Sequence, residues 1–309
     1  MNMEPIDSLL ITGSNGFVGQ SFLDYLSSLP VQNRPKELYL ANRRTLVDRK
    51  FNQFRDTNIH QIRADLELPW NFDFTVSHVL NLAADGSSTS YSSESARSFT
   101  TIGKNLAEWA KHIRPKVLVH ASSGACFGLT PIEGNTDISQ NKSKFISSRL
   151  QSEEYITDSC KEFDVRIVIA RLFTFIGPQL LSKKQYAVSN FINGAVNNGT
   201  INVTGNKRTI RSYMHESTMS MWLYQCLTNS SAKHIVSVGS SDPVTIKELA
   251  EFISNLTGAV INYIHPNASG DQYVAINEEE KQLLGLDEGV NWRQSVQECI
   301  ELLESRKVV

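Results

Sequence analysis

Leu9-Leu10-Ile11-Thr12-Gly13-Ser14-Asn15-Gly16-Phe17-Val18-Gly19 is the stretch that decides the fold of this chain. An apolar strand runs into a Gly-x-x-Gly-x-x-Gly turn, and apolar residues at helical spacing follow it. Gly13 allows a tight turn, Gly16 lets backbone amides approach a pyrophosphate, and Gly19 lets the helix lie close to the strand. An anion then fits at the helix N-terminus. The alternative is an ordinary tight turn, but the order of strand, glycines and helix predicts a dinucleotide site contacted by Gly13, Asn15, Gly16, Phe17, Val18 and Gly19.

Size and composition set broad limits. With 309 residues and 40% hydrophobic content, the chain has enough apolar side chains for a large core and about two domains. The net charge of -2 provides no electrostatic footprint for long polyanions, so we do not expect nucleic-acid binding. No apolar run approaches the roughly 18 residues that a membrane span needs, so we do not expect membrane insertion. The four cysteines form no C-x-x-C pair and have no zinc-like spacing, which predicts reduced thiols, no metal site and a cytoplasmic location.

Short apolar runs alternate with helical patterns along the first half of the chain. We predict strands near residues 37–41, 59–64, 76–83, 116–121 and 165–170, with helices over residues 95–112 and 145–161. Such alternation predicts an α/β fold, a Rossmann-like doubly wound parallel sheet whose ligands bind at the carboxyl ends of the strands. We expect a dinucleotide-binding domain over residues 1–175, rejoined by segments near residues 210–240. Residues 176–309 are expected to form mainly a smaller substrate lobe, with a loose Gly- and Asn-rich segment over residues 193–206.

Several further motifs occur in a characteristic order. They are Ala64-Asp65-Leu66, Asn81-Leu82-Ala83-Ala84, Ser122-Ser123, Arg171-Leu172-Phe173-Thr174 and Arg211-Ser212-Tyr213. Together with the glycine turn, this order resembles the extended short-chain dehydrogenase/reductase family, in particular its nucleotide-sugar epimerases, dehydratases and reductases. The resemblance implies cofactor contacts at Asp65, Leu66, Leu82, Ala83, Ala84 and Phe173, and substrate contacts at Thr174, Arg211 and Tyr213. Structural alternatives are a turn cap for Asp65, a surface ion pair for Arg211 and core packing for Tyr213.

The end of the second strand bears on the choice of coenzyme. A site that prefers NAD usually places a carboxylate there to accept from the ribose hydroxyls, whereas this chain has Asn42, Arg43 and Arg44. A guanidinium neutralises a 2′-phosphate and stacks on adenine. We therefore predict that NADP(H) is favoured over NAD(H), the alternative being that both arginines are solvated loop residues.

The positions that carry proton transfer in the family are altered. Members of the family use a Ser or Thr with a Y-x-x-x-K pair, and Ser123 matches the hydroxyl. Phe145 stands at the tyrosine position and Arg149 at the lysine position, so the resemblance leaves Arg149 a role on the ribose hydroxyls. Phenylalanine has no proton to donate, and arginine stays charged at neutral pH. Candidate substitutes are Lys142, Lys144, Cys126, Tyr91 and His215, each of which also has an ordinary structural interpretation.

Two function hypotheses follow. The first is an NAD(P)-dependent oxidoreductase of a nucleotide sugar, performing C4 keto reduction or epimerisation in surface polysaccharide synthesis. Dehydration is disfavoured because Gly124-Ala125 replaces the Asp-Glu pair of the family's 4,6-dehydratases. The second is a catalytically silent family member that binds a dinucleotide and acts as a regulatory or scaffold partner. The helices over residues 95–112 and 145–161 resemble those that pair relatives into homodimers.

Overall fold

The computed structural model describes residues 4–44, 53–84, 92–128, 130–131, 140–183, 186–265, 270–287 and 289–307. Its centre is a seven-stranded parallel sheet in the order β12-β7-β5-β4-β1-β2-β3. The strands are β1 (Ser8–Thr12), β2 (Glu37–Asn42), β3 (Asn58–Arg63), β4 (His78–Asn81), β5 (Val117–Ser123), β7 (Arg166–Leu172) and β12 (Ile235–Val238). This is a Rossmann-like doubly wound sheet, as predicted, and the predicted strands differ from the observed ones by one to two residues at most ends.

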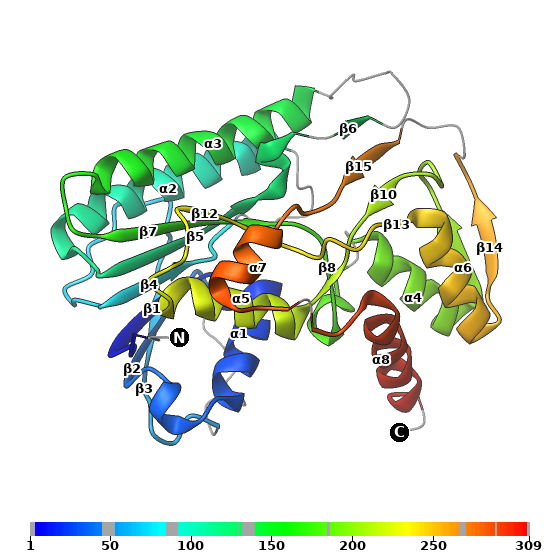
Figure 1. Ribbon diagram of the computed structural model, residues 1–309, viewed down its shortest axis with the longest axis horizontal. Helices are drawn as coiled ribbons and strands as arrows, with labels where there is room; N and C mark the ends of the chain where they lie inside the picture. Colours follow the sequence, from blue (N-terminus) through cyan, green and yellow to red (C-terminus); the bar gives the residue numbers. More distant parts are fainter. Residues whose placement is uncertain are drawn as a thin grey trace.

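Helices cover both faces of this sheet (Figure 1). One face carries α2 (Ser93–Ile113) and α3 (Gln140–Cys160), and the other carries α1 (Phe17–Ser28) and α5 (Glu216–Thr228). Leu9 and Ile11 of β1 belong to the core on the α1 side, while Leu10 belongs to the core beneath α2 and α3. A strand buried on both faces in this way is expected in a parallel sheet.

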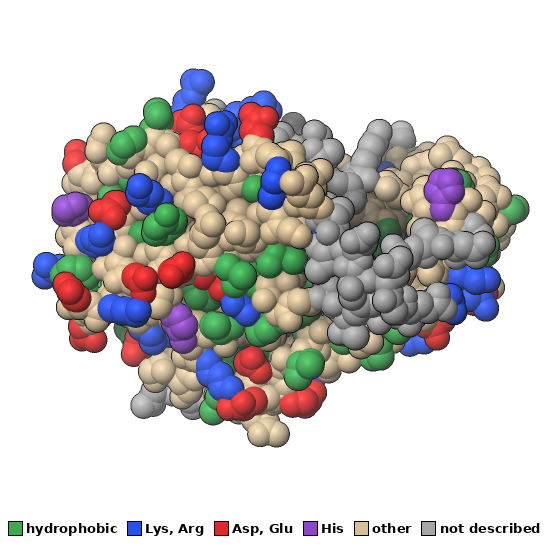
Figure 2. Space-filling view, turned by 90° about the horizontal axis from the view of Figure 1, so that it is seen from above, with side chains coloured by type: hydrophobic (Ala, Val, Ile, Leu, Met, Phe, Trp, Pro, Cys, Tyr) green, Lys and Arg blue, Asp and Glu red, His purple; other side chains and the backbone are tan. Residues whose placement is uncertain are grey.

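Helices α2 and α3 lie side by side because Gly103 leaves no side chain between them. A Cβ atom built on Gly103 would lie 1.8 Å from Ser152 Oγ. Figure 2 views the molecule from the side of this helix pair, where basic, acidic and apolar side chains are interspersed. None of the helices in the described ranges has the length and apolar character needed to cross a bilayer.

The second lobe contains α4 (Ala187–Asn198), α6 (Ile246–Thr257) and α8 (Trp292–Ser305), at the right of Figure 1. Two-stranded pairs join β9 (Thr200–Val203) to β14 (Val260–Tyr263) and β8 (Phe175–Ile176) to β11 (Met214–His215). A small sheet has the order β13-β10-β15-β6, with β13 (Val244–Thr245), β10 (Ile210–Arg211), β15 (Asp271–Tyr273) and β6 (Thr130–Pro131). Helix α7 (Glu278–Leu284) follows this sheet.

The expectation of a loose segment over residues 193–206 is wrong. Helix α4 occupies its first part and β9 its second. Val188, Phe191, Ile192 and Ala195 of α4 are buried at helical spacing, which drives the segment to pack as an amphipathic helix despite its asparagines. The boundary placed at residue 175 stays a prediction, although β12 lies at the edge of the central sheet.

Candidate functional site

The turn between β1 and α1 has the close backbone packing that its glycines require. Gly13 has φ +68°, and a Cβ atom there would lie 2.8 Å from the carbonyl oxygen of Leu82. A Cβ atom on Gly19 would lie 2.5 Å from Ser14 Cα, so α1 can approach the turn only with glycine at this position. Gly16 is the N-cap and has no side chain to accept from the first N–H groups of α1. The helix therefore presents backbone donors to an anion, which fits the pyrophosphate of a dinucleotide.

A buried hydrogen-bond network fixes the strand ends beneath this turn. Thr12 Oγ1 donates to Asn81 Oδ1 at 2.5 Å, and Asn81 Nδ2 donates to His120 Nδ1 at 2.7 Å. His120 Nε2 lies 3.2 Å from the hydroxyl of Ser152 in α3. Burial lowers the pKa of His120 to about 3, so its ring is neutral at physiological pH. The network connects β1, β4, β5 and α3, which holds the floor of the site rigid.

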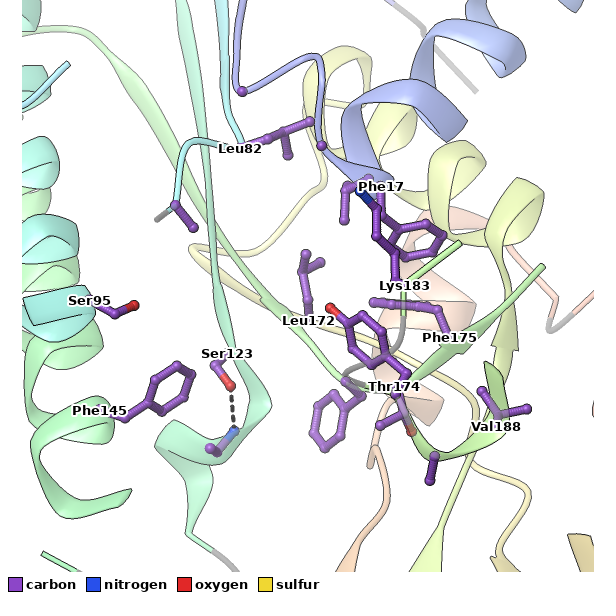
Figure 3. Close-up of a pocket in the computed structure, with 18 of the residues that line it drawn as sticks. Phe17, Leu82, Ser95, Ser123, Phe145, Leu172, Thr174, Phe175, Lys183 and Val188 are labelled. Atoms are coloured by element: carbon purple, nitrogen blue, oxygen red, sulfur yellow. Dashed lines mark hydrogen bonds between the residues drawn. The ribbon is translucent and has the colours of Figure 1, made fainter. Parts of the chain in front are cut away.

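One cavity of about 1840 Å³ opens at the carboxyl ends of the strands and extends into the second lobe. Figure 3 shows Ser95 and Phe145 on one side of it, Phe17, Lys183 and Phe175 on the other, and Ser123 and Leu172 between them. Every site residue predicted from the sequence lines this cavity: Gly13, Asn15, Gly16, Phe17, Val18, Gly19, Asn42, Arg43, Arg44, Asp65, Leu66, Leu82, Ala83, Ala84, Ser123, Phe145, Arg149, Phe173, Thr174, Arg211 and Tyr213. Their roles remain predictions, because their position alone does not assign them.

Arg149 is the buried cation of the cavity. Its guanidinium carbon lies 3.3 Å from the ring centroid of Phe99 and 4.3 Å from that of Phe145. Only 8% of the residue is exposed, and Nη1 has no hydrogen-bond partner among the described residues. Burial lowers the pKa of this guanidinium to about 9, which leaves it cationic at neutral pH. A buried donor without a partner on the wall of a cavity fits a ligand oxygen, such as a ribose hydroxyl.

Ser123 lies at the end of β5, where its Oγ accepts from the N–H of Ala125 at 3.2 Å. Figure 3 shows the ring of Phe145 pointing toward it from α3. The hydroxyl of Tyr273 lies 3.4 Å from Ser123 Oγ and donates to the carbonyl oxygen of Leu172 at 3.0 Å. Sequence reasoning missed Tyr273, which lines the same cavity from β15. No motif identifies it; its only signal is alternation with Asp271 on a strand.

The expected substrate residues already make contacts within the protein. Thr174 Oγ1 donates to the backbone carbonyl of Ser212, and burial raises the pKa of Tyr213 to about 12. Arg211 Nη1 lies 2.6 Å from Asp271 Oδ1, and Lys142 Nζ lies 2.8 Å from Asp271 Oδ2. Burial alone would raise the pKa of the Asp271 carboxyl, but Arg211 and Lys142 hold it below its usual value.

Three of the other candidate proton donors, Lys144, Cys126 and His215, lie outside the cavity lining or have structural roles. Lys144 Nζ donates to Ser93 Oγ at 3.1 Å, outside the residues that line the cavity. Burial raises the pKa of Cys126 to about 11, and Cys126 does not line the cavity. His215 is the N-cap of α5 and accepts from the N–H of Ser217. Tyr91 lies outside the described residues.

The ends of β2 and β3 form another part of the cavity wall. Asn42 accepts from the N–H of Asn15 at 3.1 Å and donates to Ser14 Oγ at 2.7 Å, so its amide holds the glycine turn. The side chains of Arg43 and Arg44 are exposed at the cavity wall. Asp65 accepts from the N–H of Glu67 at 3.1 Å, which is the turn-cap role left open by the sequence.

A buried ion pair lies behind Ser123. Arg171 donates from Nε and Nη2 to the two carboxylate oxygens of Glu153, at 3.1 and 2.7 Å. Ser122 Oγ donates to the same carboxylate at 2.5 Å. This cluster ties α3 to β5 and β7 and positions the helix that carries Phe145 and Arg149. Among the described residues, no group of three or more His, Cys, Asp or Glu side chains gathers as metal ligands would.

The model of the NAD dependent epimerase/dehydratase family matches residues 9–239. The chain belongs to this family. It is 23% identical over 304 residues to UDP-glucuronic acid decarboxylase 2 of Arabidopsis thaliana, with 93% of this chain and 66% of that protein covered. It is 23% identical over 261 residues to UDP-glucuronic acid decarboxylase 1 of Xenopus tropicalis, with 81% of this chain and 60% of that protein covered. The chain thus spans slightly less than two thirds of the length of these relatives.

Solved structures share the whole fold. MoeE5 in complex with UDP-glucose and NAD superposes with a TM-score of 0.77 at 20% identity, covering 98% of this chain and 100% of that one. UDP-glucuronic acid 4-epimerase from Bacillus cereus, in complex with UDP-glucuronic acid and NAD, gives a TM-score of 0.75 at 18% identity, covering 97% and 99%. The resemblance to nucleotide-sugar enzymes predicted from the motifs is confirmed at the level of family and fold.

Proposed function

We propose that this protein is a nicotinamide-dinucleotide-dependent oxidoreductase of a nucleotide-linked sugar. The observation that carries the proposal is a single cavity joining the glycine turn, Ser123 and the second lobe. A dinucleotide and a nucleotide sugar are both long molecules, and the cavity volume of about 1840 Å³ is larger than the usual small-molecule pocket. The family match and the nucleotide-sugar complexes of MoeE5 and the Bacillus cereus epimerase support the same ligand classes.

Each part of the cavity has a task in this proposal. The first N–H groups of α1 hold the pyrophosphate, and Arg149 donates to ribose hydroxyls. When bound, the dinucleotide supplies or accepts a hydride at a ring carbon of the sugar. Ser123 donates its hydroxyl proton in a hydrogen bond to the reacting sugar oxygen. Arg211 lines the cavity and in this proposal binds the diphosphate of the substrate.

The reaction proposed is C4 keto reduction or epimerisation, within the synthesis of surface polysaccharides in the cytoplasm. Gly124 and Ala125 provide no carboxyl group for elimination of water, which disfavours dehydration. The test is incubation of the purified protein with UDP- and dTDP-linked sugars in the presence of NAD+ or NADP+, and with the corresponding 4-keto sugars in the presence of NADH or NADPH. Products are separated by chromatography, because an epimerisation leaves the total of reduced coenzyme unchanged. Absence of any new sugar nucleotide across the panel would refute the enzymatic proposal.

A second candidate is a catalytically silent dinucleotide-binding protein, favoured by Phe145 at the usual tyrosine position. Calorimetric binding of dinucleotide and sugar nucleotide without turnover would support it. The homodimer expected through α2 and α3 belongs to both candidates. Light scattering that gives the mass of one chain at micromolar concentration would refute the dimer.

The coenzyme preference is a separate proposal. The solved neighbours named above hold NAD, whereas Arg43 and Arg44 on this chain favour the 2′-phosphate of NADP(H). We expect the double variant Arg43→Ala/Arg44→Ala to weaken NADPH binding by about tenfold or more, since each charge-assisted hydrogen bond contributes about 1.5–3 kcal/mol before discounting for exposure. NADH binding should change little. Equal affinity of the unmodified protein for NADH and NADPH would refute the preference.

A further inference from the structure

Tyr273 presents a phenol beside the residue expected to bind the reacting oxygen. Its hydroxyl lies 3.4 Å from Ser123 Oγ and donates to the carbonyl oxygen of Leu172 at 3.0 Å. A phenol has one proton, so with that proton on Leu172 the Ser123 hydroxyl is the donor toward Tyr273. All three residues line the main cavity. The two hydroxyl groups therefore meet at the point where β5 and β7 end.

The position of the phenol follows from the small sheet of the second lobe. Strand β15 lies between β10 and β6, and its alternation places Asp271 and Tyr273 on one face. The Tyr273 ring stacks on Phe173, with centroids 4.8 Å apart and an interplanar angle of 29°. The Arg211 guanidinium carbon lies 5.9 Å from the centroid of the Tyr273 ring. Contacts with Phe173 and with the Leu172 carbonyl hold the phenol in one orientation.

We propose that Tyr273 is the general acid and base of this site and replaces the phenol missing at Phe145. The inference rests on the proposed function. One substrate oxygen fits within hydrogen-bond distance of both hydroxyls, because the 3.4 Å between them is well below twice the usual O···O distance of about 2.8 Å. Of the other candidate proton donors, Lys142 is paired with Asp271, and His215 caps α5.

The proton balance of a keto reduction can be written completely. A hydride from the reduced dinucleotide forms the new C–H bond as the carbonyl π bond breaks, which reduces the sugar and oxidises the coenzyme. When the sugar binds, the Tyr273 O–H turns from the Leu172 carbonyl to the carbonyl oxygen of the sugar, and the Ser123 O–H turns from Tyr273 to the same oxygen. The Tyr273 O–H bond then breaks as its proton moves to that oxygen, and Ser123 keeps its own proton while donating a hydrogen bond to it. Solvent then reprotonates the phenolate. In the oxidative direction, the phenolate takes the hydroxyl proton of the sugar.

The proposed proton donor belongs to a different part of the fold than a tyrosine on α3 would. A phenol at position 145 would belong to the same body as the coenzyme site, whereas Tyr273 belongs to the lobe. The proton donor is thus complete only when β15 lies against the ends of β5 and β7. The Arg211 guanidinium of β10 lies near the Tyr273 ring, and Arg211 and Lys142 of α3 both pair with Asp271, which shares β15 with Tyr273.

The decisive variant is Tyr273→Phe, which keeps the ring and removes only the hydroxyl. With a substrate that the unmodified protein turns over, we expect kcat to fall about 100-fold or more while KM and the dinucleotide Kd change little. Tyr155→Phe is the matched control, because Tyr155 is exposed on α3 and does not line the cavity. The double variant Tyr273→Phe/Phe145→Tyr should recover part of the lost rate, since it restores a phenol next to Ser123 from the opposite side.

A readout independent of turnover is the tyrosinate absorbance. Oxidised nicotinamide carries a positive charge, which favours an adjacent phenolate. In the unmodified protein, binding of the oxidised dinucleotide should shift the ionisation of one tyrosine to lower pH, and Tyr273→Phe should remove that shift. Loss of the shift together with loss of kcat supports the inference.

Failure of the inference and failure of the proposed function give different results. If Tyr273→Phe turns substrate over at the rate of the unmodified protein, Tyr273 is not the acid, and the proposed function stands. If the folded unmodified protein turns over no sugar nucleotide in the panel, both are overturned. A rate loss accompanied by an equal loss of dinucleotide affinity would assign Tyr273 to binding and overturn its role as acid.

Discussion

Replacement of Arg149 by methionine should stabilise the free protein and weaken its coenzyme binding. Arg149 is 8% exposed as a residue, and its Nη1 has no hydrogen-bond partner among the described residues. It is held between the rings of Phe99 and Phe145 at 3.3 and 4.3 Å. Methionine fills most of the same volume and contacts aromatic rings favourably, but it carries no charge and no donor.

The free-energy changes expected for Arg149→Met have opposite signs in the free protein and in the dinucleotide complex. In the free protein, an unsatisfied buried donor costs about 1–3 kcal/mol or more, while a desolvated cation–π contact returns about 2 kcal/mol. Methionine removes the cost of the unsatisfied donor and replaces part of the cation–π energy with a sulfur–aromatic contact of about 0.3–1.5 kcal/mol. At the centre of these ranges Arg149→Met gains about 1 kcal/mol, which for 309 residues is a Tm rise of about 1.5 °C. In the complex, loss of a charge-assisted hydrogen bond costs about 1.5–3 kcal/mol, or about 10- to 100-fold in Kd.

The assay is thermal unfolding with and without saturating dinucleotide, together with calorimetric Kd values. Arg293→Met is the matched control, because Arg293 stacks on Trp292 at 4.3 Å but is exposed on α8, away from the cavity. The control should leave the Kd unchanged. A lower Tm for free Arg149→Met, combined with undiminished dinucleotide affinity, would refute the reasoning.

Three further predictions concern stability. Burial lowers the pKa of His120 from 6.5 to about 3, so between these pH values the unfolded chain binds a proton that the folded chain does not. The free energy of unfolding should therefore be highest above pH 6.5 and fall by about 1.4 kcal/mol per pH unit as the pH is lowered toward 3. Urea unfolding of His120→Asn should show a smaller pH dependence over this range. Glu153→Gln leaves Arg171 buried without its counter-charge and should cost about 3–5 kcal/mol in guanidinium unfolding, whereas the uncharged Glu153→Met/Arg171→Met pair should recover most of it. Gly19→Ala places a Cβ atom 2.5 Å from backbone and should lose about 1–3 kcal/mol of stability, offset by about 1 kcal/mol of helix propensity. At Gly16 the nearest atom to the added Cβ is 3.2 Å away, so Gly16→Ala should melt near the Tm of the unmodified protein and lose chiefly dinucleotide affinity in calorimetry.

The fold was largely predictable because local signals agreed with one another. The glycine turn and the alternation of strands with helices predicted the parallel sheet, and each element boundary depended on side chains close in sequence. Helix α4 was missed because asparagines and Gly194 obscured the apolar spacing of Val188, Phe191, Ile192 and Ala195. Its stability comes from packing in the lobe core, which no local pattern reports.

The site was predictable only where its residues belong to continuous motifs. Residues near the glycine turn and the strand ends line the cavity as expected, since parallel strands end at one edge of the sheet. Tyr273 was not predictable, because it reaches Ser123 across 150 positions of sequence through the small lobe sheet. The pairing of Arg211 with Asp271 was hidden for the same reason.

The carboxylate of Asp271 sits between Lys142 of α3 and Arg211 of β10, both on the cavity wall. Two cations share this one carboxylate, so the cluster keeps one net positive charge on the cavity wall. We expect the diphosphate of a nucleotide sugar to be attracted by this excess charge, and a neutral sugar to gain nothing from it, so the second lobe should discriminate in favour of anionic ligands.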